Sequence, residues 1–331
     1  MWLKQQNKTY FVLSVTTIKS KTMSFRKLHG LFAAHKPADL SCYHLIGTLK
    51  TNLLKDLNAS SKLYLPKLVK VSAAGKDTDD KQLWKVEEKE DLRYHPLVAG
   101  PYFNMLNIQI VSGGLDTKSS GVLVLSVGKA SKYISAYQKA LLPRQYHIDI
   151  QLGIATDNYE PGGKVILKST YHHISREKFD RVVAGLTKAS KQYNTNYSGL
   201  DMQSQEAYDL AVAGKLETVT LFNQPSILSA RCLNFNPPHI KLEMECLNED
   251  SEFLRETVDF LGRSLRSSAV AFRINRIKDG PFTSNNSLLR RQWTLFNVAQ
   301  SLQESKEIIK PFIKNNKTVL DNLHEEEIAT T

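Results

Sequence analysis

Two hydrophobic periods run along this chain, one typical of strands and the other typical of helices. Residues 145–156 alternate between apolar and polar side chains, as in a strand with one buried face. Residues 251–265 carry an apolar side chain at every third or fourth position, as in a helix with one buried face. The apolar sets are Tyr146, Ile148, Ile150 and Leu152 for the strand, and Leu254, Val258, Leu261 and Leu265 for the helix.

The same periods predict the other elements. Further strands are predicted at 29–36, 121–125 and 240–246, the first of them ending at Lys36-Pro37. Further helices are predicted at 45–57, 129–142, 174–186, 205–214 and from 301 onward, with Gly214 closing the fourth. Because strands and helices are interspersed without regular βαβ units, the fold class is α+β, with a mixed, largely antiparallel sheet and flanking helices.

Three segments lack either period and are predicted to be irregular. Residues 73–93 carry many charges of both signs, typical of an exposed, solvated loop inserted into the domain. Residues 156–164 are rich in turn-forming side chains, and residues 187–196 form a polar linker.

The composition indicates a globular protein with a polyanionic partner. A chain of 331 residues that is 41% hydrophobic can bury a large core. Its 44 Lys and Arg outnumber 33 Asp and Glu, which favours nucleic acid as the partner. Cys42, Cys232 and Cys246 are scattered and lack CxxC spacing, which argues against a disulfide framework or a zinc site. No apolar run approaches the roughly 18 residues of a transmembrane helix.

The first 38 residues contain no Asp or Glu, while Lys, Arg, Ser and Thr are frequent. This composition is typical of a mitochondrial transit peptide, so we expect residues 1–27 to be a leader and the protein to reside in the mitochondrial matrix. A disordered basic arm and a short signal peptide are the alternatives. We expect a catalytic domain at 28–300, and a helical extension with an acidic tail at 301–331.

One carboxylate stands out in the segment GGLDTKSSGVLVL, residues 113–125. Asp116 lies between a glycine pair and a predicted buried strand, where a solvated turn residue is the common explanation. A nucleophile or base held at the mouth of the strand is the other explanation. The sequence contains no P-loop, zinc-protease, serine-hydrolase or Rossmann motif that would indicate another catalytic chemistry.

Two other side chains are candidates to act beside this carboxylate. Arg255 lies next to the apolar stripe of its helix and is either a solvated helix residue or a cation that orients Asp116. Tyr146 lies on the apolar face of its strand and is either a core residue or a platform on which a base stacks.

Five segments, in the same order, resemble the TruB family of pseudouridine synthases. GGLDTKSSGVLVL is similar to the family's GGTLDPxASGVL-type motif, and Asp116 matches the family's catalytic aspartate. The other segments are HKPADLS at 35–41, PRQYHIDIQLGIATDNYEPGGKV at 143–165, YSGLDMQSQEAYDLAVAG at 197–214, and FLRETVDFLG at 253–262 followed by RINRIKDGPF at 273–282.

The resemblance implies the pseudouridine synthase fold, here without an RNA-binding PUA domain, and isomerisation of a flipped-out uridine without cofactor or metal. It assigns Asp116 as nucleophile, with Arg255 pairing with it and Tyr146 stacking on the base. The substrate-binding positions that it implies are Lys36, Gly113, Gly114, Leu115, Phe253, Ile274 and Arg276.

The chain also departs from the family pattern. Val111 stands in place of a His that supports the opened RNA, Phe253 in place of a Tyr, and Glu160 in place of an Asp. With the basic leader, these changes resemble the animal mitochondrial members of the family. That likeness implies mitochondrial messenger RNA as substrate, with tRNA or rRNA as alternatives, and RNA-granule or ribosome-assembly proteins as partners. An RNA-binding or RNA-folding factor with weak catalysis is the competing function.

Overall fold

The computed structural model describes residues 28–60, 67–76, 82–128, 134, 137–138, 140, 142–197, 203–213 and 225–309. The predicted leader, the C-terminal tail and most of the predicted helix at 129–142 lie outside the described residues. None of the described helices has the length and apolar character that a membrane crossing requires.

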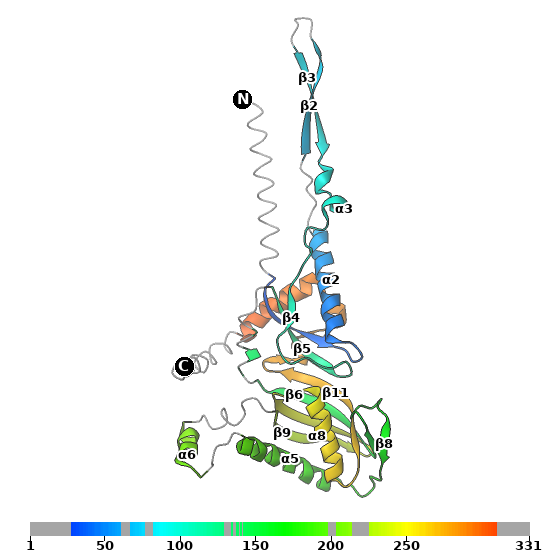
Figure 1. The fold of residues 1–331 in the computed structure, drawn as a ribbon, viewed down its shortest axis with the longest axis vertical. Coiled ribbons are helices and arrows are strands. Elements are labelled where there is room, and N and C mark those ends of the chain that lie inside the picture. The colour runs from blue at the N-terminus through cyan, green and yellow to red at the C-terminus, as the bar shows by residue number, and fades with distance from the viewer. Residues whose placement is uncertain are drawn as a thin grey trace.

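A nine-stranded mixed sheet forms the centre of the fold (Figure 1). Its order is β13-β1-β5-β11-β6-β10-β9, with β12 paired to β11 and β4 paired to β5. The strands are β1 (Gly30–Lys36), β4 (Ile108–Ile110), β5 (Ser120–Val127), β6 (Arg144–Leu152), β9 (Ser226–Asn236), β10 (His239–Leu247), β11 (Ala269–Asp279), β12 (Phe282–Thr283) and β13 (Ser287–Leu288). The pairs β1–β13 and β5–β11 are parallel and the other pairs are antiparallel, which confirms the predicted α+β class.

The strands follow the sequence patterns that predicted them. In β6, buried residues alternate with partly exposed ones from Tyr146 to Leu152, because only one face of this strand meets the core. In β5, every residue from Gly121 to Val127 is buried. β5 also approaches β11 very closely, since a Cβ at Gly121 (φ +121°) would lie 2.2 Å from the carbonyl oxygen of Arg276.

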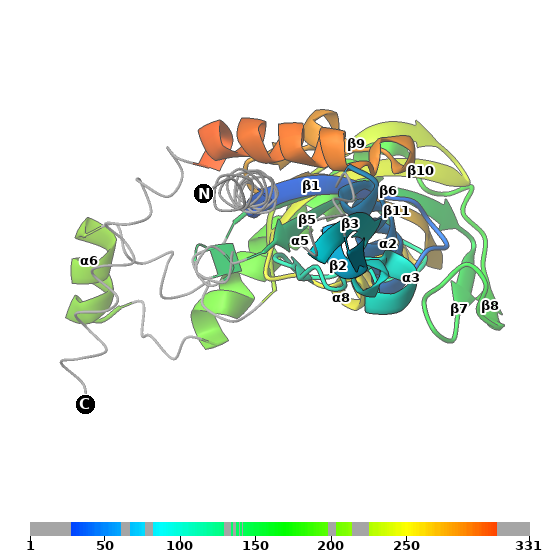
Figure 2. The same ribbon diagram turned by 90° about the horizontal axis from the view of Figure 1, so that it is seen from above.

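Helices cover the sheet on both sides. They are α2 (Cys42–Ser60), α3 (Pro96–Ala99), α5 (Arg176–Tyr197), α6 (Gln205–Val212), α8 (Ser251–Ser264) and a helix over residues 295–309, with short 3-10 turns at Leu92–Tyr94, Ser284–Asn286 and Arg290–Gln292. Figure 2 shows α8 and the 295–309 helix on opposite sides of the strands.

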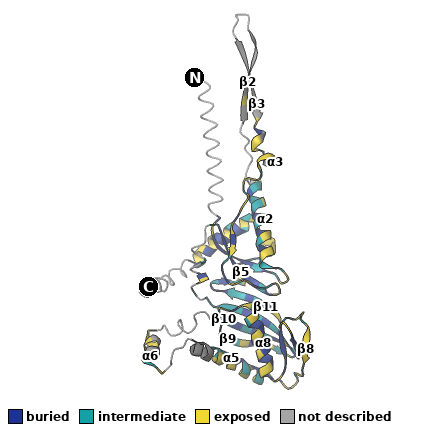
Figure 3. Cartoon of the chain, viewed as in Figure 1, coloured by how far each residue is buried: buried dark blue, intermediate teal, exposed yellow. Residues whose placement is uncertain are grey.

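Two main groups of buried side chains fill the core. α5 and α8 pack their apolar stripes on β6, β9, β10 and β11. α2 and the 295–309 helix pack on β1 and β5, with Trp293, Val298 and Leu302 buried among them. Figure 3 shows the buried residues concentrated in the sheet and on the helix faces that meet it.

The structure corrects three details of the predicted elements. The segment 73–93, expected to be a loop, contains most of a hairpin formed by β2 (Lys67–Lys76) and β3 (Gln82–Glu90), which projects beyond α2 in Figure 1. The two strands are antiparallel, and their register places Lys67 opposite Glu90 and Lys70 opposite Glu87.

The other two corrections concern helix ends. α5 continues to Tyr197 through the expected linker 187–196, and the C-cap of α6 is Ala213 instead of Gly214. The expected turn after residue 156 is present between β7 (Ile154–Thr156) and β8 (Val165–Lys168), which pair as a small hairpin.

Candidate active site

The segment that carries Asp116 is a loop between β4 and β5, anchored by three separate elements. From β11, the Arg276 guanidinium donates to the carbonyl of Gly113 at 2.9 Å. From α2, the Cys42 thiol donates to the carbonyl of Leu115 at 3.1 Å. From the end of β1, the Lys36 ammonium donates to the carbonyls of Thr117 and Ser119 at 3.1 and 2.6 Å. The backbone is therefore fixed on both sides of Asp116.

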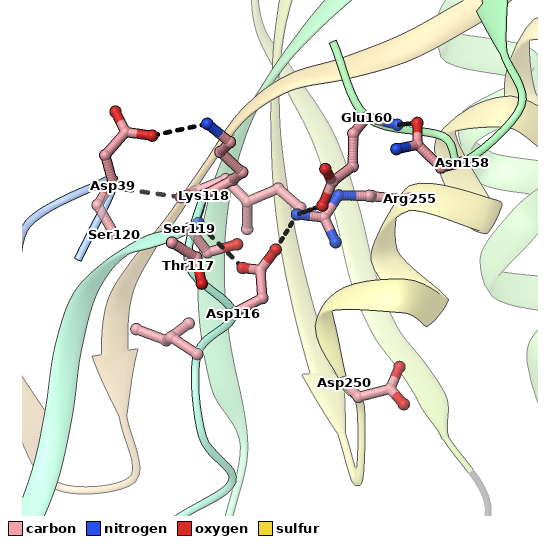
Figure 4. A network of polar contacts seen from close by, with 12 residues as sticks. Asp39, Asp116, Thr117, Lys118, Ser119, Ser120, Asn158, Glu160, Asp250 and Arg255 are labelled. Atoms are coloured by element: carbon pink, nitrogen blue, oxygen red, sulfur yellow. Dashed lines mark hydrogen bonds and ion pairs between the residues drawn. The ribbon is translucent and has the colours of Figure 1, made fainter. Parts of the chain in front are cut away.

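The Asp116 carboxylate is held by two donors (Figure 4). The backbone N–H of Ser119 donates to Oδ1 at 2.9 Å, and the Arg255 guanidinium forms a hydrogen bond and ion pair with Oδ2. Glu160 Oε1 lies 3.5 Å from the same guanidinium nitrogen of Arg255. The Asp116 side chain is 26% exposed and that of Arg255 is 9% exposed, so the carboxylate reaches the surface while its cation lies behind it.

These contacts keep Asp116 ionised. Burial alone would raise its pKa, but the hydrogen bonds from Ser119 and Arg255, with the guanidinium charge, outweigh burial and lower the pKa below its ordinary value. A carboxylate that is ionised, oriented and open to the surface can act as a nucleophile at neutral pH.

Arg255 reaches this position because α8 begins at a well-formed cap. The Asp250 carboxylate accepts the backbone N–H of Phe253 at 2.7 Å, which fixes the first turn. Arg255 follows on the second turn and is buried. The alternative of a solvated helix arginine is therefore excluded.

The apolar residues assigned to substrate binding lie together. Leu115, Tyr146 and Ile274 belong to one buried cluster, and Phe253 packs against it. Tyr146 is only 2% exposed, and the guanidinium carbon of Arg276 lies 5.7 Å from the centre of its ring. The structure thus brings the expected base-pocket residues to one place, with the tyrosine ring covered.

Lys36 and Arg276, which the resemblance also assigns to substrate binding, contact the Asp116 loop. Both side chains are fully buried and hydrogen bonded to the Asp116 loop. In the RNA-free chain they support the backbone of this loop, and their assignment to substrate binding stays a prediction. Burial lowers the pKa of Lys36, and the nearby charge of Asp116 partly offsets that effect.

The residues just before Asp116 show what can approach the loop. A Cβ added at Gly114 would meet no atom within 4 Å, whereas one at Gly113 would lie 3.3 Å from the Arg144 guanidinium. Val111, which stands in place of the family's His, is fully buried beside Val122 and Val124. Its side chain is therefore part of the core and is not a contact for RNA.

Two acidic residues of this region were not identified as site residues from the sequence. Glu160 shares Arg255 with Asp116, and its only signal was its position in the resembling block. Glu249 is buried and accepts a hydrogen bond from the Tyr146 hydroxyl at 2.5 Å. No local pattern in the sequence marked it as a site residue. Within the described residues, no group of three or more His, Cys, Asp or Glu could hold a metal ion.

Comparison with known proteins identifies the class of this site. Residues 110–250 match the model of the "TruB family pseudouridylate synthase (N terminal domain)". The chain is a pseudouridine synthase, an enzyme that isomerises uridine to pseudouridine in RNA.

Two relatives extend the match over most of the chain. "Pseudouridylate synthase TRUB2, mitochondrial" of Xenopus tropicalis is 39% identical over 285 residues, covering 85% of this chain and 87% of the relative. The Homo sapiens protein of the same name is 36% identical over 280 residues, covering 84% of each. The chain belongs to the TruB family, which confirms the resemblance seen in the sequence.

Among solved structures, the chain is similar to one titled "Structure of H/ACA RNP bound to a substrate RNA containing 2'-deoxyuridine". The TM-score is 0.44 at 11% identity, covering 82% of this chain and 53% of the solved one.

Proposed function

We propose that Asp116 is the nucleophile of this pseudouridine synthase and that its substrate is RNA in mitochondria. The observation that carries the proposal is the pairing of Asp116 with Arg255, which leaves the carboxylate ionised, oriented and partly exposed. Without a basic partner, burial would raise the pKa of a carboxylate in this place. A smaller fraction of it would then be ionised, and it would be a poorer nucleophile.

The remaining site residues take roles that agree with their positions. The flipped uridine enters beside Gly114, where the loop is open. Asp116 forms a transient bond to the nucleoside, at C1′ or at C6 of the base, and the N1–C1′ bond breaks. The base rejoins C1′ through C5, and the bond to Asp116 breaks again. The proton on C5 is lost and N1 gains one, so atoms and charge balance without a cofactor.

The base then lies against the cluster of Leu115, Tyr146, Phe253 and Ile274. Since Tyr146 is covered in the RNA-free chain, stacking requires the side chains above its ring to move as the base enters. Lys36 and Arg276 hold the loop in place for the attack.

The nucleophile is tested by Asp116→Asn, which keeps the size of the side chain and removes its charge. We expect no pseudouridine in a single-turnover assay with a uridine-containing RNA, at nearly unchanged RNA affinity. Asp180→Asn is the matched control, because Asp180 forms an exposed ion pair with Arg176 on α5. Pseudouridine formation by Asp116→Asn at the rate of the control would refute the proposal.

Mitochondrial messenger RNA is the proposed substrate class, with tRNA as the runner-up and rRNA as a further alternative. Support comes from the acid-free leader and from relatives whose names place them in mitochondria. Pseudouridines should be mapped in mitochondrial mRNA, tRNA and rRNA from cells whose only copy is Asp116→Asn. If pseudouridines are lost only from tRNA, tRNA replaces mRNA as the proposed substrate. If all pseudouridines survive, an RNA-binding factor with weak catalysis is favoured.

The proposed location is the mitochondrial matrix, and RNA-granule or ribosome-assembly proteins are the proposed protein partners. A reporter fused behind residues 1–38 should be imported, because this leader is basic and contains no acid. A reporter that stays in the cytosol would refute the location.

A further inference from the structure

A charge-balanced network lies buried beneath the Asp116 loop. Its cations are Arg144 and Arg276, and its carboxylates are Glu249 and Asp279. The Arg276 guanidinium donates to Asp279 Oδ2 at 2.8 Å, and Arg144 Nε lies 3.5 Å from Asp279 Oδ1. Both carboxylate side chains are fully buried. Removing one member of such a network leaves a buried partner without its counter-charge.

Glu249 joins this network to the residues of the proposed base pocket. Its Oε1 accepts a hydrogen bond from the Tyr146 hydroxyl at 2.5 Å and another from Arg144 Nη1 at 2.9 Å. The guanidinium of Arg144 lies close to Gly113, three residues before Asp116, since a Cβ added there would be 3.3 Å from it. One carboxylate oxygen therefore binds the tyrosine hydroxyl and the arginine that lies beside the start of the catalytic loop.

Glu249 also fixes the helix that carries Arg255. It directly precedes Asp250, the N-cap of α8, and its own carbonyl accepts a second contact from Arg144 Nη1 at 3.4 Å. The preceding residue, Asn248, adopts a positive φ of 54°, a conformation that turns the chain between β10 and α8. Both the backbone and the side chain of Glu249 are thus tied to β6 at the point where α8 begins.

We propose that Glu249 is a positioning residue for the isomerisation, a role that rests on the proposed function of Asp116. It holds Tyr146, the Gly113 segment and the start of α8 in one geometry, so that Asp116 and its Arg255 partner meet the base correctly. Glu249 does not contact the reacting atoms, because its side chain is fully buried beneath them.

The test is Glu249→Gln. It keeps the shape of the side chain and one acceptor oxygen, but it removes the negative charge to which Tyr146 and Arg144 donate their hydrogen bonds. We expect the single-turnover rate constant to fall by about a hundred-fold, since a misplaced reacting group costs that much. The dissociation constant of the RNA should change by less than about two-fold, because rate and affinity report separate steps. Glu256→Gln is the matched control, an exposed glutamate on the same helix. A rate equal to that of Glu256→Gln, or a loss seen only in affinity, would overturn the proposal.

A second variant probes the same link without removing a buried charge. Tyr146→Phe deletes only the hydroxyl that donates a hydrogen bond to Glu249. We expect a lower single-turnover rate at unchanged RNA affinity. The double variant should be no slower than the slower single variant, because both changes break one connection. Full activity of Tyr146→Phe, or losses that multiply in the double variant, would overturn the role of Glu249.

Asp116→Asn is measured alongside to separate the two proposals. Activity in that variant refutes the nucleophile. An inactive Asp116→Asn together with a fully active Glu249→Gln refutes only the positioning role.

Discussion

The substitution Gly121→Ala should destabilise the protein strongly, although it adds a single methyl group. Gly121 lies in β5 with φ at +121°, a conformation that L side chains rarely adopt. Its added Cβ would lie 2.2 Å from the carbonyl oxygen and 2.5 Å from the nitrogen of Arg276, both of which are backbone atoms. Neither atom can turn away as a flexible side chain could, so the two strands must separate.

The expected loss of stability is the sum of the backbone strain and the steric clash. A non-glycine residue in such a backbone conformation costs roughly 1–3 kcal/mol. Overpacking against rigid atoms costs roughly another 1–3 kcal/mol. The sum of about 2–6 kcal/mol is a large part of the 5–15 kcal/mol that stabilises a typical domain.

Activity should fall together with stability. The Arg276 backbone has to retreat by about 1 Å to reach an ordinary contact distance. Its guanidinium bond to the Gly113 carbonyl, now 2.9 Å, would then stretch beyond hydrogen-bond range. The loop that carries Asp116 would lose one of its three anchors.

Urea unfolding followed by circular dichroism measures the change in the free energy of unfolding. Gly185→Ala is the matched control, since Gly185 is exposed on α5 and its added Cβ meets nothing within 4 Å. That substitution should stabilise the protein by about 0.5–1 kcal/mol, as expected for alanine inside a helix. The reasoning is refuted if Gly121→Ala unfolds within about 0.5 kcal/mol of the unsubstituted protein.

Three further outcomes are expected. Arg255→Met should lower the single-turnover rate far more than RNA affinity. The control is Arg263→Met, which replaces an exposed arginine on the same helix and should change neither quantity. Equal losses in rate and affinity would mean that Arg255 binds phosphate. The same substitution removes the hydrogen bond and charge that lower the pKa of Asp116, so the pH below which activity is lost should move upward in a pH–rate profile; an unmoved profile would contradict this cause. RNA affinity should weaken steeply as salt increases from about 50 to 200 mM in a binding titration, because phosphate contacts release counterions; salt-independent binding would contradict a basic RNA-binding face.

Much of the fold could be predicted from local pattern. The period-two alternation of β6 and the apolar stripe of α8 each place their residues in the core as the sequence indicated. The pairing of Asp116 with Arg255 was one of two interpretations of Arg255 and was assigned by the family resemblance, since 139 residues separate the two and no local pattern connects them. The burial of Arg255 then decided between its two interpretations.

The errors have physical causes. The charged hairpin was predicted to be a loop because charges of both signs are dense from residue 73 onward, and the first half of β2 lies before that segment. The burial of Lys36 and Arg276, which the family resemblance assigned to substrate binding, could not be seen in the sequence, because it depends on the backbone carbonyls and on Asp279 that accept their hydrogen bonds. Glu249 gave no signal, because a buried carboxylate is recognised only once its partners from β6 are known.

The place of β11 makes the active site depend on a strand that lies late in the chain. Among the described strands, only β11 pairs with both β5 and β6, so it joins the half of the sheet behind Asp116 to the half on which α8 packs. Until residues 269–279 are in place in the sheet, the segments that carry Asp116 and Arg255 belong to two unconnected pieces. A chain shortened before residue 269 should therefore lack the Asp116–Arg255 pair, and activity should appear only once the two halves of the sheet have joined.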